Sequence, residues 1–124
     1  MTTILVVDDS LIGRHVVEAM LSSLSYNLEF AVDGQEALDK AIELKPTLII
    51  LDIMMPKIDG IEVTKLIRKH EVISETPIII FTALDDKDTK NRALKAGANS
   101  VLVKPIRKTL LKETIEAILD TKGN

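Results

Sequence analysis

The chain has 124 residues, which suits a single domain and leaves little room for a second. Hydrophobic residues make up 46% of it, enough to bury a core, so the composition excludes an intrinsically disordered chain. A net charge of -3 with only three aromatic residues argues against direct nucleic-acid binding, and the absence of Cys excludes disulfides, thiol catalysis and Cys-based zinc sites.

Short apolar runs alternate along the chain with segments of helical spacing. In chain order, the sequence predicts a strand at 4–7, a helix with its apolar stripe at 17–24, a strand at 27–32 and a helix that begins after Asp33–Gly34 and stops before Pro46. It then predicts a strand at 48–51, a helix at 61–70, a strand at 78–81, a helix at 86–96 closed by Gly97, a strand at 101–103 and a helix at 108–119. Continuous Ile, Leu and Val runs are typical of strands buried on both faces. The run at 27–32 carries Glu29, so we expect that strand nearer an edge of the sheet.

Strand followed by helix, five times over, predicts a parallel sheet with right-handed crossovers and helices on both faces. We expect residues 1–120 to form this domain, with residues 121–124 as a C-terminal tail or the start of a linker. No apolar run is long enough to cross a bilayer, and the first residues lack a secretory pattern. We therefore expect a soluble, cytoplasmic protein.

Polar side chains follow four of the predicted strands at the point where each strand ends. Asp8 and Asp9 follow the first, Asp52 the third, Thr82 the fourth and Lys104 the fifth. In open α/β sheets this is the edge at which ligands bind. Three neighbouring carboxylates repel each other, and a site of few carboxylates plus water suits Mg²⁺. A carboxylate that attacks a phosphoryl group needs such positive charge nearby, and a lysine and a hydroxyl would assist it.

Each of these residues also has an ordinary structural explanation. An Asp after a strand is commonly a turn former or a helix N-cap. Asp9 or Ser10 could cap the first helix, Thr82 could cap the stretch before the fourth helix, and Lys104 alone could be a solvated lysine. Their coincidence at one sheet edge is what favours the functional interpretation, since short motifs taken singly match by chance.

The stretches ILVVDDS, LIILDIMMPKIDGIE, PIIIFTA and LVKP, in this order and spacing, resemble the receiver domains of bacterial-type response regulators over essentially the whole chain. The resemblance implies an α/β, flavodoxin-like (βα)5 three-layer sandwich with a five-stranded parallel sheet of order 2-1-3-4-5. The implied site residues are the phosphoacceptor Asp52, the switch hydroxyl Thr82, the phosphate-contacting Lys104, and, as Mg²⁺ ligands, Asp8, Asp9, Asp52 and the backbone carbonyl of Met54.

The same resemblance implies a phosphorylation-activated receiver of a two-component phosphorelay. It would take its phosphoryl group from a phosphohistidine of a kinase or phosphotransfer partner and then switch protein contacts, with the face of the fourth helix, fifth strand and fifth helix as a dimer surface. It would be no enzyme beyond slow self-dephosphorylation. Two alternatives remain: a phosphorylation-independent, receiver-like binding module, and a magnesium-dependent aspartyl phosphohydrolase. The second is disfavoured because Met54 stands where those enzymes carry a second acid.

Three local features modify this expectation. The family usually carries Tyr or Phe three residues before the lysine, and Val101 stands there. Since a short, β-branched side chain cannot make the aromatic rotamer swing, we expect a backbone-led change in the 82–87 loop or a dimerisation shift. Met54 and Leu84 flank the expected path of hydrolytic water, which predicts slow self-dephosphorylation unless both merely pack. The Lys104–Pro105 peptide is typically cis in this family.

Overall fold

The computed structural model of the protein describes residues 2–123, with side chains through Asp120. The strands are β1 (Thr3–Val7), β2 (Asn27–Ala31), β3 (Leu48–Asp52), β4 (Ile78–Thr82) and β5 (Ser100–Val103). The helices are α1 (Leu11–Leu21), α2 (Gly34–Leu44), α3 (Gly60–Lys69), α4 (Lys87–Ala96) and α5 (Lys108–Gly123). All ten predicted elements are therefore present and in the predicted order.

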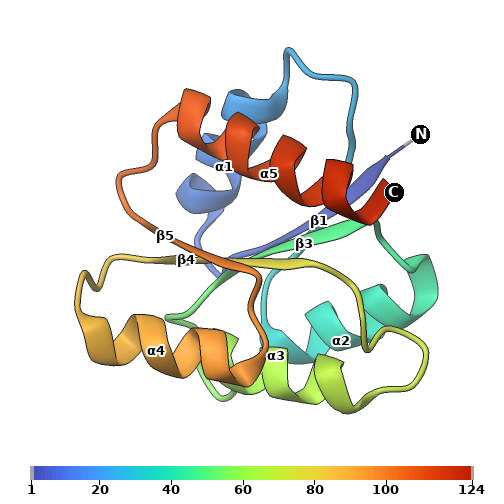
Figure 1. Cartoon of the computed structure of the whole chain (residues 1–124), viewed down its shortest axis with the longest axis vertical. Coiled ribbons are helices and arrows are strands. Elements are labelled where there is room, and N and C mark those ends of the chain that lie inside the picture. Colours follow the sequence, from blue (N-terminus) through green and yellow to red (C-terminus); the bar gives the residue numbers. More distant parts are fainter. Residues whose placement is uncertain (1, 124) are drawn as a thin grey trace.

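The five strands pair in parallel in the order β2-β1-β3-β4-β5. Helices α1 and α5 cover one face of this sheet, and α2, α3 and α4 cover the other (Figure 1). This confirms the expected flavodoxin-like, three-layer sandwich. It also confirms the edge position expected for the strand that carries Glu29, because β2 is the outermost strand beside β1.

The two faces of the sheet have separate cores, and alternate residues of each strand belong to one or the other. In β1, Ile4 and Val6 pack toward α1 and α5, whereas Leu5 and Val7 pack toward α2, α3 and α4. All four side chains are essentially buried. Covering both faces explains why the strand sequences are continuously apolar, and each such Ile or Leu contributes about 1.5–3 kcal/mol of burial free energy.

Short polar side chains begin four of the helices. The N-caps are Ser10 for α1, Asp33 for α2, Asp59 for α3 and Asp86 for α4. Each accepts a hydrogen bond from the backbone N–H three residues ahead, which satisfies one of the donors left open in a first turn and stabilises the helix by about 1 kcal/mol. Of the two alternatives that the sequence left open for the first helix, Asp9 and Ser10, it is Ser10 that caps α1.

Most predicted boundaries lie within one residue of the observed ones, and two helix ends differ by more. Helix α1 ends at Leu21, so Leu24 lies beyond it and packs, partly buried, against the core under α1 and α5. Strand β2 ends at Ala31, one residue short of the predicted end. Helix α5 continues to Gly123, whereas Leu119 was its predicted end; of the expected tail, residue 124 lies outside the described residues. The predicted closure of α4 is confirmed by Gly97, with φ 117°.

Among the residues that the structure describes, no helix combines the length and the apolar character needed to span a bilayer.

Candidate functional site

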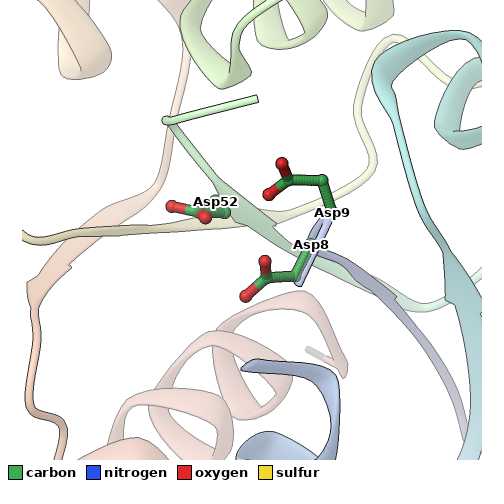
Figure 2. A group of neighbouring side chains, drawn as sticks. All are labelled: Asp8, Asp9 and Asp52. Atoms are coloured by element: carbon green, nitrogen blue, oxygen red, sulfur yellow. The ribbon is translucent and has the colours of Figure 1, made fainter. Parts of the chain in front are cut away.

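The acidic residues meet because their strands are neighbours. In the β1–β3 pairing, Val7 lies opposite Leu51, so the residues that follow them, Asp8 and Asp52, leave the sheet side by side. Figure 2 shows the carboxylates of Asp8, Asp9 and Asp52 gathered where β1 and β3 end. One carboxylate oxygen from each lies within 4.8 Å of those of the others. The structure thus brings together the three acids predicted from the strand ends.

The same edge carries the predicted hydroxyl and ammonium groups. Thr82 ends β4, and Lys104 directly follows β5. The backbone N–H of Lys104 donates to the carbonyl of Thr82 at 2.8 Å, which fixes the two strand ends relative to each other. The Lys104–Pro105 peptide is cis, as expected.

Lys104 bridges two of the acids. Its Nζ lies 3.4 Å from Oδ2 of Asp52 and 3.8 Å from Oδ2 of Asp8. Asp8 and Asp52 are both buried, whereas Asp9 is exposed at the surface. Burial raises the pKa of the Asp52 carboxyl above its ordinary value; Lys104 opposes this rise, and the negative charge of Asp8 adds to it.

The backbone after each strand turns back toward the site. The N–H of Met54 points to Oδ1 of Asp52 at 3.4 Å, a long contact, and the N–H of Leu84 donates to Oγ1 of Thr82 at 2.9 Å. Thr82 is fully buried at the end of β4. Met54 and Leu84 are 60% and 42% exposed, so neither is packed in the core.

Several residues that shape the site were missed in the sequence. The N–H of Ser10 donates to Oδ1 of Asp8 at 2.9 Å. Nη1 of Arg14 donates to the backbone carbonyl oxygen of Asp8 at 2.8 Å. A Cβ at Gly13 would lie 2.0 Å from Oδ2 of Asp8, so the missing side chain leaves room for that carboxylate under α1. The one available signal was position: all three lie within six residues of the acid, at the N-cap and in the first turn of α1.

Gly60 has a similar role at the end of β3, beside Asp52. A Cβ there would lie 2.4 Å from the carbonyl oxygen of Asp52, and the Gly60 N–H donates to the carbonyl of Ile53 at 2.9 Å. Only a glycine permits α3 to begin so close to the end of β3. Gly60 therefore holds the start of α3 against the backbone that carries Asp52.

Val101 occupies the position where an aromatic residue was expected from the family resemblance. It lies in β5 opposite Ile80 of β4 and packs, partly buried, against the core under α2, α3 and α4. A valine in this setting is held by its strand neighbours and has little rotamer freedom.

An apolar cleft of about 390 Å³ opens beside the acids, between α1 and the segment that links β5 to α5. Asp8 and Lys104 lie at its polar end, and Val17, Met20 and Phe81 line its apolar part. The adjoining outer surface of α1 carries exposed apolar side chains, those of Leu11, Ile12 and Val16. An exposed apolar patch of this kind is typical of a surface on which another protein docks.

The donor chemistry of the acidic cluster fits a hard divalent cation. Three carboxylates offer oxygen ligands, and no softer nitrogen or sulfur ligand belongs to the group among the described residues. Mg²⁺ prefers one or two carboxylates together with water, a requirement that a half-exposed cluster meets.

Comparison with known proteins agrees with this geometry. Residues 4–116 match the family model described as "Response regulator receiver domain". Over 94% of its length the chain is 41% identical to the "Alkaline phosphatase synthesis transcriptional regulatory protein PhoP" of Bacillus subtilis, and over 96% it is 41% identical to the "Response regulator ArlR" of Staphylococcus aureus. These matches cover 48% and 53% of those two proteins, so the chain spans about half the length of the curated relatives it matches.

Solved structures give the same result for the fold. The chemotaxis protein CheY4 of Vibrio cholerae superposes with a TM-score of 0.88 at 35% identity, and the match covers 94% of this chain and 98% of that one. A response regulator from Chloroflexus aurantiacus superposes with a TM-score of 0.92 at 33% identity, with 96% and 98% covered.

Proposed function

The chain belongs to the response regulator receiver family, whose members are two-component signalling proteins and not enzymes, and we propose that Asp52 is the residue that accepts the phosphoryl group. One observation carries this proposal. Asp52 is a buried carboxylate at the carboxyl end of a central strand, with Lys104 3.4 Å away and two further acids beside it. A nucleophilic carboxylate, a fixed cation and a set of metal ligands together are what aspartyl phosphorylation requires.

In the proposed reaction, a carboxylate oxygen of Asp52 attacks the phosphorus of a phosphohistidine. A P–O bond forms, the P–N bond breaks, and the imidazole leaves with the electron pair of that bond and takes up a proton. Lys104 already contacts Asp52, so its ammonium group is placed to offset charge on a phosphoryl oxygen. The Thr82 hydroxyl would donate a hydrogen bond to another phosphoryl oxygen after a small shift of its loop.

We propose that Asp8, Asp9, Asp52 and the backbone carbonyl of Met54 hold Mg²⁺ at this site. When bound, the cation would offset the negative charge that accumulates where a carboxylate meets a phosphoryl group. The residues of the chain already lower that charge in part, through the ion pairs of Lys104 with Asp8 and Asp52. These ion pairs offset the negative charge of the three carboxylates only in part, and this supports the binding of a cation at the site.

The phosphodonor in this proposal is a histidine kinase or a histidine phosphotransfer protein. A donor histidine has to reach Asp52 from outside the sheet, past the end of α1. The exposed Leu11, Ile12 and Val16 offer an apolar docking surface along that approach. The apolar cleft beside Lys104 continues this surface toward the β5–α5 segment.

For the output, we propose that phosphorylation shifts the population of conformations of the 82–87 loop and thereby alters the face of α4, β5 and α5, including any dimer formed through it. Val101 supports a change led by the backbone, since its side chain cannot swing. Crystal structures with and without a phosphoryl mimic test this, and a loop in the same position in both would refute it. We further propose that residues 1–120 are the receiver unit and that the residues after them lead out of it.

The direct test is the intact mass of the protein after incubation with Mg²⁺ and acetyl phosphate. We expect one phosphoryl adduct on the wild type, none on Asp52→Asn, none after chelation of Mg²⁺, and an unchanged adduct on the matched surface variant Asp39→Asn. An adduct that persists in Asp52→Asn would refute the role of Asp52. No adduct on the wild type would instead favour the receiver-like module that signals without phosphate.

A further inference from the structure

A groove between α3 and α4 is lined mostly by cations. It has a volume of about 350 Å³, and five of its seven lining residues are basic: Lys65, Arg68, Lys69, Arg92 and Lys95. No carboxylate is among the lining residues described. The two helices lie side by side on the face of the sheet away from α1 and α5 (Figure 1). The whole chain is acidic, with a net charge of -3, so this concentration of positive charge is local.

Helix dipoles explain only part of this charge. Arg68, Lys69 and Lys95 lie in the last turns of their helices, where a cation is favoured by the partial negative charge of the helix end. Lys65 and Arg92 lie in the middle of α3 and α4 and gain nothing from that effect. Lys65 also has Lys69 one turn ahead, and like charges at this spacing destabilise a helix by about 0.2–0.5 kcal/mol.

Arg68 has a structural role at the end of the groove. Its guanidinium donates to the carbonyl of Gly97 through Nε at 3.0 Å and Nη2 at 2.8 Å, and to those of Ser74 and Thr76 through Nη1 at 3.0 and 2.7 Å. Nη2 also donates to Oδ1 of Asn99 at 3.0 Å. These bonds tie the end of α3 to the C-terminal cap of α4. The walls of the groove are thus held at a fixed separation, with Lys65, Lys69, Arg92 and Lys95 exposed along them.

The chemistry of the lining selects among anionic ligands. No aromatic side chain lines the groove, and Phe81, Phe30 and Tyr26 all pack on the opposite side of the sheet. A nucleobase would therefore find nothing to stack on, which disfavours a nucleotide or single-stranded nucleic acid. Ile61 and Ala96 form an apolar floor between the two cationic rows. Cations on both sides of an apolar strip are complementary to an acidic segment that carries a few apolar side chains.

We propose that the α3–α4 groove is a docking site for an acidic, amphipathic helix of a partner protein. Helices α3 and α4 have ten residues each, so each wall is about 15 Å long and accommodates about three turns of the docked helix. Carboxylates spaced three or four residues apart on the partner would face Lys65 and Lys69 on one wall and Arg92 and Lys95 on the other. The site is separate from the phosphoacceptor and does not require phosphorylation.

The test uses the unphosphorylated full chain without Mg²⁺, so its outcome is independent of Asp52 chemistry. A displayed library of random 16-residue helical peptides is selected on the wild type, on Lys65→Glu/Arg92→Glu, and on Lys108→Glu/Lys112→Glu. The last variant makes the same charge change at two exposed residues of α5. Far-UV circular dichroism checks that all three are folded, and fluorescence anisotropy gives the Kd of each enriched peptide.

We expect the wild type and the α5 variant to enrich peptides with Asp or Glu at helical spacing around apolar residues. These peptides should bind Lys65→Glu/Arg92→Glu at least tenfold more weakly, and peptides with Lys in place of Glu should regain affinity for that variant. No acidic enrichment, or equal weakening by the two variants, would overturn the proposal. So would tighter binding of a 20-base-pair DNA duplex or inorganic polyphosphate than of the peptides, since the groove would then be a site for phosphate polyanions.

Discussion

Replacing Asp52 by Asn should make the protein more stable at neutral pH when Mg²⁺ is absent. The substitution keeps the shape of the side chain and its ability to accept the N–H of Met54. It removes one negative charge from a cluster in which three carboxylates lie within 4.8 Å. Asp52 is 7% exposed, so its charge is also largely withdrawn from water.

The size of the effect follows from the balance of charges. At an effective dielectric constant of about 20, Asp52 and Asp8 repel by at least about 3.5 kcal/mol, since their carboxylate oxygens lie within 4.8 Å. Lys104 attracts Asp52 by about 5 kcal/mol at 3.4 Å. The attraction is reduced because Lys104 is 34% exposed, so the two nearly cancel. What remains is the cost of burying the carboxylate and the screened repulsion from Asp9. Because the site is open to solvent on one side, we expect the free energy of unfolding of the Asn variant to be about 1–2 kcal/mol higher than that of the wild type.

The stability difference between Asp52→Asn and the wild type should depend on pH in a defined direction. Burial raises the pKa of Asp52 in the folded protein above its ordinary value of 3.8, so the folded state holds this proton more tightly than the unfolded state does. The free-energy cost of holding Asp52 ionised in the folded protein is therefore absent below the pKa of Asp52 in the unfolded state. This cost grows as the pH rises toward the pKa of Asp52 in the folded state and is complete above it. The advantage of Asp52→Asn should be present at pH 7.5 and should fade toward pH 3.5.

Urea unfolding followed by far-UV circular dichroism measures this difference, with Asp39→Asn as the control for loss of an exposed acid. Adding Mg²⁺ should then stabilise the wild type by an amount that grows with its concentration, and stabilise Asp52→Asn less. An Asn variant that is less stable than the wild type at pH 7.5, or equally favoured at both pH values, would refute the reasoning.

Three further substitutions test other parts of the structure. Gly60→Ala places a Cβ 2.4 Å from the carbonyl oxygen of Asp52 and should cost about 2–3 kcal/mol in urea unfolding; a loss below about 0.5 kcal/mol would show that α3 moves freely. Arg68→Met removes the donors to the Gly97 carbonyl and its neighbours and should cost about 2–4 kcal/mol in thermal unfolding, whereas an unchanged Tm would contradict the bracing role. Met54→Asn introduces a polar group beside the expected path of water and should shorten the lifetime of the phosphoryl adduct several-fold in a mass time course; an equal lifetime would remove the basis for slow self-dephosphorylation.

Much of the site could be predicted because its residues are tied to strand ends. A strand buried on both faces shows as an unbroken apolar run, and the residue after it must emerge at the carboxyl edge of a parallel sheet. This places Asp8, Asp52, Thr82 and Lys104 at one edge before any contact is known. Helix ends were less predictable, as Leu24 shows: it continues the apolar stripe of α1 and is partly buried, but lies outside the helix. A periodic pattern reports burial, and burial continues where hydrogen bonding has stopped.

The sequence by itself determined the α/β class, the order of its elements and the identity of the acidic edge, because these follow from local periodicity and from which residues end each strand. The strand order 2-1-3-4-5 was implied by the family resemblance and not by periodicity. Only the tertiary structure decided which groups touch across that edge and which helix faces meet. Lys65 and Arg92 are far apart along the chain, and the packing of α3 beside α4 brings them into one groove. The close approach of Gly13 to Asp8 and the bonds of Arg68 to Gly97 likewise depend on how elements pack. Packing is a sum over contacts between distant residues, and no local pattern in a single sequence records it.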